Sequence, residues 1–313
     1  MNFSNVIKNE ILGKFNKDIH CKKAFLAGYI RGLGLIVEYD GVLGLEVKAN
    51  STKVENIIIE HLVTIYKLST DDIQVFSRGK EDKCIIGIYN DNAINVLLDL
   101  EVFTLLNGEY QVNFNMFEGN ITKKDCCLRA FFRGLFLACG NCTIPNQQNN
   151  ANTGYHLQIV FSHSVPAEVT ARQLYKFNIE AKITRRKENY VVYLKSAEHI
   201  KDFIAFLPAP VAVLNIMDLM INREISNKSN RQKNCDLGNL NRQVEASLKQ
   251  VEAIKKLVSS GALDNLRTDL KETAIARLDY PDETLIELAE RLNISKSCLN
   301  HRLRKLVSLS NQI

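Results

Sequence analysis

The chain has 313 residues, 46% of them hydrophobic and 24% charged, with a formal net charge of +5, which is ordinary for a globular chain of about two domains. Eight cysteines in this length are too dilute for a disulfide scaffold, so we expect reduced thiols. The opening residues, MNFSNVIKNEILGKF, include Glu10 and no uninterrupted apolar stretch, which excludes a secretory signal and a membrane span. We therefore expect a cytoplasmic protein with no membrane partner.

The first hundred residues predict an alternation of helices and strand pairs. The expected helices cover residues 21–33, 52–66 and 92–103, and the expected strand pairs lie within 35–49 and 73–89. In the second strand pair, a charged turn beginning at Arg78 separates two apolar runs, which is typical of a hairpin.

An internal repeat relates two parts of the chain. A shift of 106 residues places three small residues of "LAGYIRGLG" on three of "FRGLFLACG", namely Gly28, Gly32 and Gly34 on Gly134, Ala138 and Gly140. At an offset of 107, "RGKEDKCII" from Arg78 matches "RRKENYVVY" from Arg185. A duplicated α+β unit is the simplest account, with repeats at about residues 21–104 and 122–205 in a domain over 1–221. The Asn-rich insert Pro145–Gly154 is predicted to be a loop.

Glycines within the two motif helices predict that these helices pack against each other. Glycine lowers helix propensity, and a surface helix has no reason to accept that cost. Close approach of the two helices explains it. The pair would then form the seam between the repeats, with the two sheets spread to either side as a saddle.

The second predicted domain covers residues 222–313. A linker is expected over Asn222–Asn234, where polar residues interrupt the apolar pattern, and a long helix over Leu240–Val258. From Asn222 onward, 16 Lys and Arg stand against 12 Asp and Glu, a net of +4 that leaves +1 for the first 221 residues. No acidic residue follows Glu290, so the five basic residues beyond it are uncompensated: Arg291, Lys296, Arg302, Arg304 and Lys305.

Residues at about 284–308 predict a helix-turn-helix. In "TLIELAERLNISKSCLNHRL", Leu285, Leu288, Ala289 and Leu292 share one helical face, and Leu299, Leu303 and Leu306 repeat at helical spacing in a second helix. Asn293 occupies the turn, where a positive φ is tolerated, Ile294 fills the corner, and Ser295 offers an N-cap oxygen. An ordinary helical hairpin is the alternative.

The outward positions of the second helix carry the predicted DNA contacts. Lys296, Ser297, Asn300, His301 and Arg304 are donors and acceptors of the kind that reach base edges in the major groove. Arg302 and Lys305 are better placed for phosphates.

Both glycine motifs resemble the LAGLIDADG signature of homing endonucleases, and nearly the whole chain resembles the bacterial WhiA family of sporulation and cell-division regulators. Beyond the duplicated domain, "NRQKNCDLGNLNRQ" from Asn230 and the terminal "SKSCLNHRLRKL" are similar to that family. The resemblance implies a saddle domain followed by a helix-turn-helix.

The eighth residue of each motif decides the expected chemistry. In the endonucleases that the motifs resemble, this residue is an acid that binds the catalytic divalent metal, but here the two positions are Leu33 and Cys139. Neither supplies the hard oxygen ligand that Mg²⁺ needs. Glu38 and Asp40 follow the first motif without a counterpart after the second, where Asn141 and Cys142 follow. We therefore expect a nuclease scaffold that binds without cutting.

Other chemistry finds little support in the sequence. Cys139 and Cys142 form a CxxC, which is half of a zinc site or a redox pair, but no second ligand pair stands at the usual spacing. His156, His163 and His199 are scattered, and no Gly-rich phosphate loop is present. No metal site and no cofactor are expected.

The sequence thus predicts a non-enzymatic, sequence-specific DNA-binding protein that regulates transcription or cell division and associates with the nucleoid. Its expected partners are double-stranded DNA and, through the amino-terminal domain, a protein co-regulator. Two alternatives stay open, a metal-dependent DNA endonuclease with displaced ligands and an RNA-binding, maturase-like protein.

Overall fold

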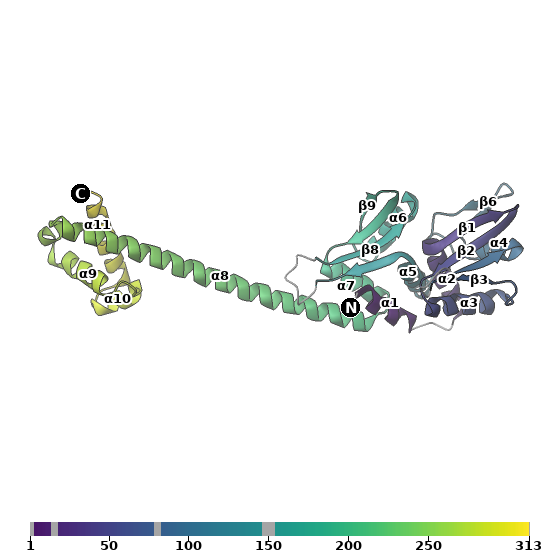
Figure 1. Ribbon diagram of the computed structural model, residues 1–313, viewed down its shortest axis with the longest axis horizontal. Coiled ribbons are helices and arrows are strands. Elements are labelled where there is room, and N and C mark those ends of the chain that lie inside the picture. The colour runs from purple at the N-terminus through teal and green to yellow at the C-terminus, as the bar shows by residue number, and fades with distance from the viewer. Residues whose placement is uncertain (1–2, 14–17, 78–82, 146–153, 313) are drawn as a thin grey trace. The chain divides into compact units, whose positions relative to one another are not determined.

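Two compact units make up the chain, Met1–Ile221 and Asn222–Ile313 (Figure 1). The computed structural model describes residues 3–13, 18–77, 83–145 and 154–312. Each unit has its own cluster of buried apolar side chains. In the described part of the chain, every helix is too short or too polar to cross a bilayer.

The first unit contains two copies of one arrangement. The first copy consists of α2 (Ile19–Leu33), β1 (Gly34–Tyr39), β2 (Val42–Ala49), α3 (Thr52–Tyr66), β3 (Gln74–Ser77), β4 (Cys84–Tyr89) and α4 (Asn90–Asp99). The second consists of α5 (Asp125–Cys139), β7 (Gly140–Thr143), β8 (His156–Phe161), α6 (Ser164–Tyr175), β9 (Lys182–Arg186), β10 (Asn189–Leu194) and α7 (Ala197–Phe206). The predicted duplication of an α+β unit is confirmed.

Each copy forms one antiparallel sheet, with strand orders β1-β2-β4-β3 and β7-β8-β10-β9. The predicted hairpin after Arg185 is present, with Arg186 paired to Asn189. The charged turn of the first copy, Arg78–Asp82, and residues 146–153 of the Asn-rich insert lie outside the described residues. Alternate residues of each sheet, such as Leu45 and Val47, enter the core beneath the helices.

Helices α2 and α5 pack together through their glycines, as predicted. A Cβ atom on Gly28 would lie 2.0 Å from the carbonyl oxygen of Phe131, and one on Gly134 would lie 2.1 Å from that of Phe25. A Cβ on Gly32 would lie 2.6 Å from the Cβ of Ala138. These separations are far below van der Waals contact, so the two backbones touch at positions where only glycine fits.

Gly34 and Gly140 have a different role from the one predicted. Each follows its helix in extended conformation as the C-cap and begins a strand. A Cβ on Gly34 would lie 2.5 Å from the carbonyl oxygen of Ile30, in its own helix. The last glycine of each motif therefore permits a sharp turn from helix into strand, while the earlier ones permit the helices to meet.

The helix predicted over residues 92–103 is shorter than expected. It ends at Asp99, and β5 (Phe103–Leu106) then pairs with β6 (Glu109–Val112) in a hairpin. Asn107 and Gly108 have φ values of 54° and 84° at its turn. Asn-Gly between apolar runs is a strong hairpin signal, and the prediction missed it because Leu105 and Leu106 suit either structure.

Helix α1 (Phe3–Leu12) forms hydrogen bonds with two parts of the first unit that are far from it in sequence. The hydroxyl of Ser4 accepts a hydrogen bond from the backbone N–H of Cys142 at 2.6 Å. The carboxylate of Glu10 accepts hydrogen bonds from the backbone N–H groups of Val211 and Ala212, at 2.9 and 3.0 Å. An acid thus stabilises the amino-terminal end of the helix that begins at Pro210, where the helix dipole is positive.

Helix α8 (Pro210–Ser259) is a single helix of 50 residues. The linker predicted over Asn222–Asn234 is therefore wrong, as is the start predicted at Leu240. Polar residues suggested a loop, but polarity alone does not end a helix. After Pro210 the helix contains no proline and one glycine, Gly238, and its exposed middle needs no apolar face.

The second unit continues through the short 3-10 helix η1 (Ala262–Asn265) into three helices, α9 (Thr268–Asp279), α10 (Leu285–Arg291) and α11 (Lys296–Ser310). Ile254 and Leu257, near the end of α8, enter the same core as Leu270 of α9 and Leu288 of α10. This small core orients α11.

Adding a methyl group at the helix crossing is expected to destabilise the first unit. Gly134→Ala drives a Cβ into the backbone of α2, and overpacking of this kind costs about 1 to 3 kcal/mol or more. The matched control is Gly238→Ala in α8, where no atom lies within 4 Å, and which gains up to about 1 kcal/mol of helix propensity. Thermal unfolding followed by circular dichroism measures both, and equal midpoints for the two variants would contradict the crossing.

Candidate nucleic-acid interface

Helix α10 begins at a capping box. The Thr284 hydroxyl accepts a hydrogen bond from the backbone N–H of Glu287 at 3.2 Å, and the Glu287 carboxylate accepts one from the backbone N–H of Thr284 at 2.8 Å. Two N–H groups at the start of the helix are satisfied in this way, which fixes where α10 starts.

The turn between α10 and α11 has the predicted construction. Asn293 has a φ of 54°, and the backbone N–H of Ile294 donates to the carbonyl oxygen of Ala289 at 3.0 Å. Ile294 packs against the core of the unit. Ser295 then accepts a hydrogen bond from the backbone N–H of Cys298 at 3.2 Å and caps α11.

Helix α11 buries the predicted face. Leu299, Leu303 and Leu306 are fully buried against α9, α10 and α8. Since residues of a helix are 100° apart, Ser297, His301, Arg304 and Lys305 lie on the opposite side. The buried leucines therefore fix which side chains α11 presents to solvent.

Most of the predicted DNA contacts are available on that outward face. Lys296, Ser297, His301, Arg304 and Lys305 are exposed, and Asn300 is half-buried on the flank. Within the described part of the chain, none of these six side chains forms a hydrogen bond or ion pair. Their donors and acceptors are not committed within the protein.

Arg302 differs from the other predicted DNA-contact residues because its side chain has partners within the protein. Its side chain is 19% exposed, and its Nε lies 3.7 Å from the carboxylate of Asp269. It also donates to the carbonyl oxygen of Asp269 at 3.3 Å. Arg302 thus connects α11 to the start of α9, and its predicted phosphate contact stays a prediction.

Arg291 likewise has partners within its own unit. Its Nε donates to the carboxylate of Glu283 at 3.1 Å, and its guanidinium lies 3.6 Å from the centre of the Tyr280 ring. The guanidinium lowers the pKa of Glu283. The uncompensated charge of the tail therefore lies on α11 and not at Arg291.

Arg277 is a residue that the sequence analysis missed. Its side chain is 2% exposed, and it donates to the carbonyl oxygens of Glu283 at 2.8 Å and Pro281 at 3.4 Å. Burial lowers its pKa. The guanidinium organises the connection from α9 to α10 from inside the core. Its position, three residues after the buried Ala274 on the apolar stripe of α9, is the signal that could have found it.

In the first unit, the eighth residue of each glycine motif is the last residue of its helix, Leu33 in α2 and Cys139 in α5. Leu33 packs partly buried against the core, and the Cys139 thiol donates to the carbonyl oxygen of Leu135 at 3.3 Å. Burial raises the pKa of Cys139 to about 12, so the group at this position is a neutral thiol.

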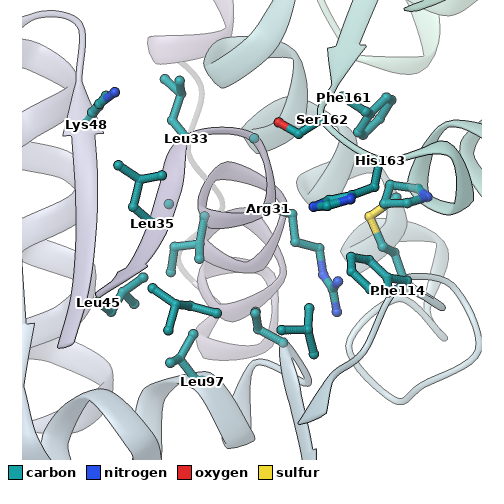
Figure 2. Close-up of a pocket in the computed structure, with 18 residues that line it drawn as sticks. Arg31, Leu33, Leu35, Leu45, Lys48, Leu97, Phe114, Phe161, Ser162 and His163 are labelled. Carbon is teal, nitrogen blue, oxygen red and sulfur yellow. The ribbon is translucent and has the colours of Figure 1, made fainter. Parts of the chain in front are cut away.

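A cavity of about 440 Å³ adjoins Leu33 (Figure 2). Leu33, Leu35, Leu45 and Leu97 lie on one side of it, with Arg31, Phe114 and His163 on the other. Arg31 donates to the carbonyl oxygens of Glu101 and Asn113, and burial lowers its pKa to about 10. None of the 18 described residues that line the cavity is acidic, so the lining offers no carboxylate ligand for a hard cation.

Comparisons with known proteins agree with both halves of this architecture. The family model for the WhiA LAGLIDADG-like domain matches residues 128–226, and that for the WhiA C-terminal HTH domain matches residues 229–310. The protein named "Probable cell division protein WhiA" of Caldicellulosiruptor saccharolyticus is 31% identical over 324 residues, which cover 100% of this chain and 96% of that protein. The chain belongs to the WhiA family.

Other WhiA proteins match over the same extent. The Bacillus velezensis protein, also named "Probable cell division protein WhiA", is 34% identical, with 100% of this chain and 97% of that protein covered. The crystal structure of full-length DUF199/WhiA from Thermatoga maritima has a TM-score of 0.58 and 21% identity, and the match covers 100% of this chain and 99% of that one. The WhiA fold, a LAGLIDADG-like domain followed by a helix-turn-helix, is thus the fold of this chain, as predicted.

Proposed function

We propose that this WhiA-family chain is a sequence-specific DNA-binding regulator of transcription or cell division, and that α11 reads the sequence. The observation that carries the proposal is the outward face of α11, whose polar and basic side chains have no partner in the described part of the protein. A helix fits the major groove of B-form DNA, whereas the major groove of an RNA duplex is too deep and narrow. This favours DNA over RNA as the partner.

We assign base recognition and phosphate contact to different residues of α11. Asn300 and His301 are one turn beyond Lys296 and Ser297 and would reach base edges, while Lys305 is one further turn beyond His301 and would contact phosphate. Arg304, which is also exposed, lies between His301 and Lys305 in the sequence. Arg302 is not assigned to a base, because Asp269 holds it.

Changing a reading residue should reduce discrimination. Asn300→Ala or His301→Ala is expected to cost about 1 to 3 kcal/mol on the preferred duplex and much less on a scrambled one. Lys305→Ala should weaken both duplexes alike and lower the magnitude of the slope of log affinity against log salt by roughly one unit.

Fluorescence anisotropy over a salt series gives both quantities. Chromatin immunoprecipitation with sequencing supplies the preferred duplex and shows whether the sites gather at promoters. Ser308→Ala, an exposed change further along α11, is the control and should leave both affinities unchanged. Equal losses on the two duplexes for Asn300→Ala and His301→Ala would remove the reading role from this helix.

We also propose that the duplicated domain does not cut DNA. Support comes from the cavity beside Leu33, whose described lining has no carboxylate, and from the neutral, partly buried thiol of Cys139. Supercoiled plasmid and the preferred duplex should therefore remain intact with Mg²⁺ or Mn²⁺. Cleavage that follows the protein through purification and disappears with EDTA would establish the alternative, an endonuclease with displaced ligands. Leu33→Asp with Cys139→Asp should not create activity, since the cleft must also position the phosphate.

The sheet faces turned away from the paired helices suggest different partners for the two repeats. On the first sheet this face carries exposed Leu35, Tyr39 and Phe76, and its Glu46 accepts hydrogen bonds from Tyr39 and Tyr89. The second sheet presents polar groups, including His156, Gln158, Lys182 and Arg186. We assign the apolar face to a protein co-regulator and a small share of DNA affinity to the second sheet.

In the full-length chain, Lys182→Ala combined with Arg186→Ala should change the affinity for the preferred duplex less than Lys305→Ala does. Phe76→Asp, on the apolar face, should leave that affinity unchanged. Mobility-shift titrations at one salt concentration compare the three. A loss for the double variant as large as that for Lys305→Ala would show that the saddle itself grips DNA.

A further inference from the structure

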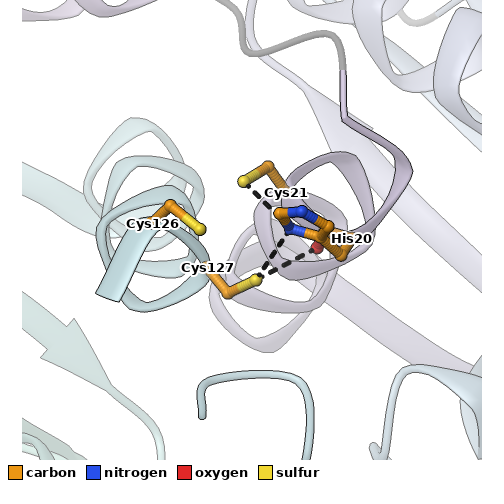
Figure 3. A group of neighbouring side chains, drawn as sticks. All are labelled: His20, Cys21, Cys126 and Cys127. Carbon is orange, nitrogen blue, oxygen red and sulfur yellow. Dashed lines mark hydrogen bonds between the residues drawn. The ribbon is translucent and has the colours of Figure 1, made fainter. Parts of the chain in front are cut away.

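A cluster of sulfur and nitrogen ligands lies at the start of the two paired helices. His20 and Cys21 come from the first turn of α2, and Cys126 and Cys127 from the first turn of α5 (Figure 3). The potential ligand atoms of these four side chains all lie within 4.8 Å of one another. The cluster is not at the motif ends. Leu33 is 13 residues along α2 from His20, about 20 Å at the rise of a helix.

The internal repeat generates this arrangement. The shift of 106 residues that relates the two motifs takes His20 to Cys126 and Cys21 to Cys127. Because α2 and α5 cross at Gly28 and Gly134, their first turns are held side by side. Two adjacent positions of each repeat therefore supply one four-ligand group.

The separations suit a tetrahedral ion. His20 Nδ1 lies 3.1 Å from Cys127 Sγ and 3.3 Å from Cys21 Sγ. When Zn²⁺ is bound at about 2.0 Å from nitrogen and 2.3 Å from sulfur, neighbouring ligand atoms are roughly 3.5 Å apart. Around the ion, these two contacts would lengthen by a few tenths of an ångström, and any pair of ligand atoms near the 4.8 Å limit would move closer together.

The histidine is oriented in the way that metal-bound histidines are. Its Nδ1 faces the thiols of Cys21 and Cys127, and its Nε2 lies 3.8 Å from the carboxylate of Asp18. Metal-bound histidines commonly donate the remote ring N–H to a carboxylate, and a small movement would bring Asp18 from 3.8 Å to hydrogen-bond distance. This contact is independent of the cysteines and points to the same centre.

The surroundings favour thiolates once a metal is present. The three cysteines lie in the first turns of two helices, whose amino-terminal dipoles stabilise negative charge.

We propose that His20, Cys21, Cys126 and Cys127 bind one Zn²⁺ as a Cys₃His site that fastens the two repeats together. Three thiol protons pass to water as three Zn–S bonds form, and the fourth bond is to His20 Nδ1. With four protein ligands the coordination is closed, which is typical of structural zinc and leaves no position for a substrate. Cys21 and Cys127 are buried and Cys126 is exposed, so the ion enters from the Cys126 side.

Metal analysis of the full-length reduced protein tests the site. Expected are one zinc per chain and, after exchange for Co²⁺, the visible bands of a tetrahedral ion with a thiolate-to-cobalt charge-transfer band. Cys126→Ser should lose the bound zinc, and because this side chain is exposed the fold should survive, as circular dichroism would verify. Asp18→Asn should weaken binding by about 10- to 100-fold.

Two control variants separate this site from the other thiols. Cys235→Ser, on the exposed surface of α8, and Cys142→Ser, in the CxxC of the second motif, should retain one zinc per chain. A zinc chelator should lower the melting temperature of the wild-type protein and leave that of Cys126→Ser unchanged.

Other outcomes would overturn the proposal. One is reduced protein that takes up neither zinc nor Co²⁺. Another is Cys126→Ser protein that binds as much zinc as the wild type does. A third is a mass lower by two hydrogens, restored by reductant, in protein without zinc, since it would make the cluster a disulfide pair.

Discussion

The backbone contact between α2 and α5 is the constraint on which the first unit depends. Gly28 and Gly134 leave no room for a side chain at the crossing, where an added Cβ would approach a carbonyl carbon or oxygen of the facing helix. The crossing aligns both helices along their length. It therefore sets the positions of Leu33 and Cys139 at one end and of the histidine and cysteines at the other. The residues at the ends of the two helices can change without disturbing this contact, so the LAGLIDADG-like fold does not depend on the groups at Leu33 and Cys139.

Much of the fold could be predicted because its determinants are local or repeated. The 106-residue shift and the helix-breaking residues located the duplicated elements. Helices α2 and α5 both begin and end at positions related by this shift. Two predictions failed for physical reasons. Asn107 and Gly108 form a tight turn that ends a run compatible with helix. In α8, a polar sequence without proline remains helical in water, so polarity was a poor guide to a linker.

The candidate site was predictable as far as one helical face determines it. Leu299 and its neighbours fix the inner side of α11, and the outward residues follow from geometry. Partners from other helices do not follow, so the contact of Arg302 with Asp269 and the inward direction of Arg277 were missed. The cysteine pattern was missed for the same reason, because ligand spacing along the chain cannot show pairs that a pseudo-symmetric crossing brings together. Comparing the repeats at His20 and Cys126 would have revealed it.

Helix α1 limits when the first unit can complete its folding during synthesis on the ribosome. Its residues emerge before their partners, since Ser4 bonds to Cys142 and Glu10 to the backbone of Val211 and Ala212. At bacterial and eukaryotic elongation rates of about 5 to 20 residues per second, roughly ten to forty seconds separate the helix from its last partner. Its apolar face, which is buried in the finished unit, packs in part against α5 and β7 and stays uncovered until those elements have been made. The first unit can therefore complete its contacts only after residue 212 has left the exit tunnel.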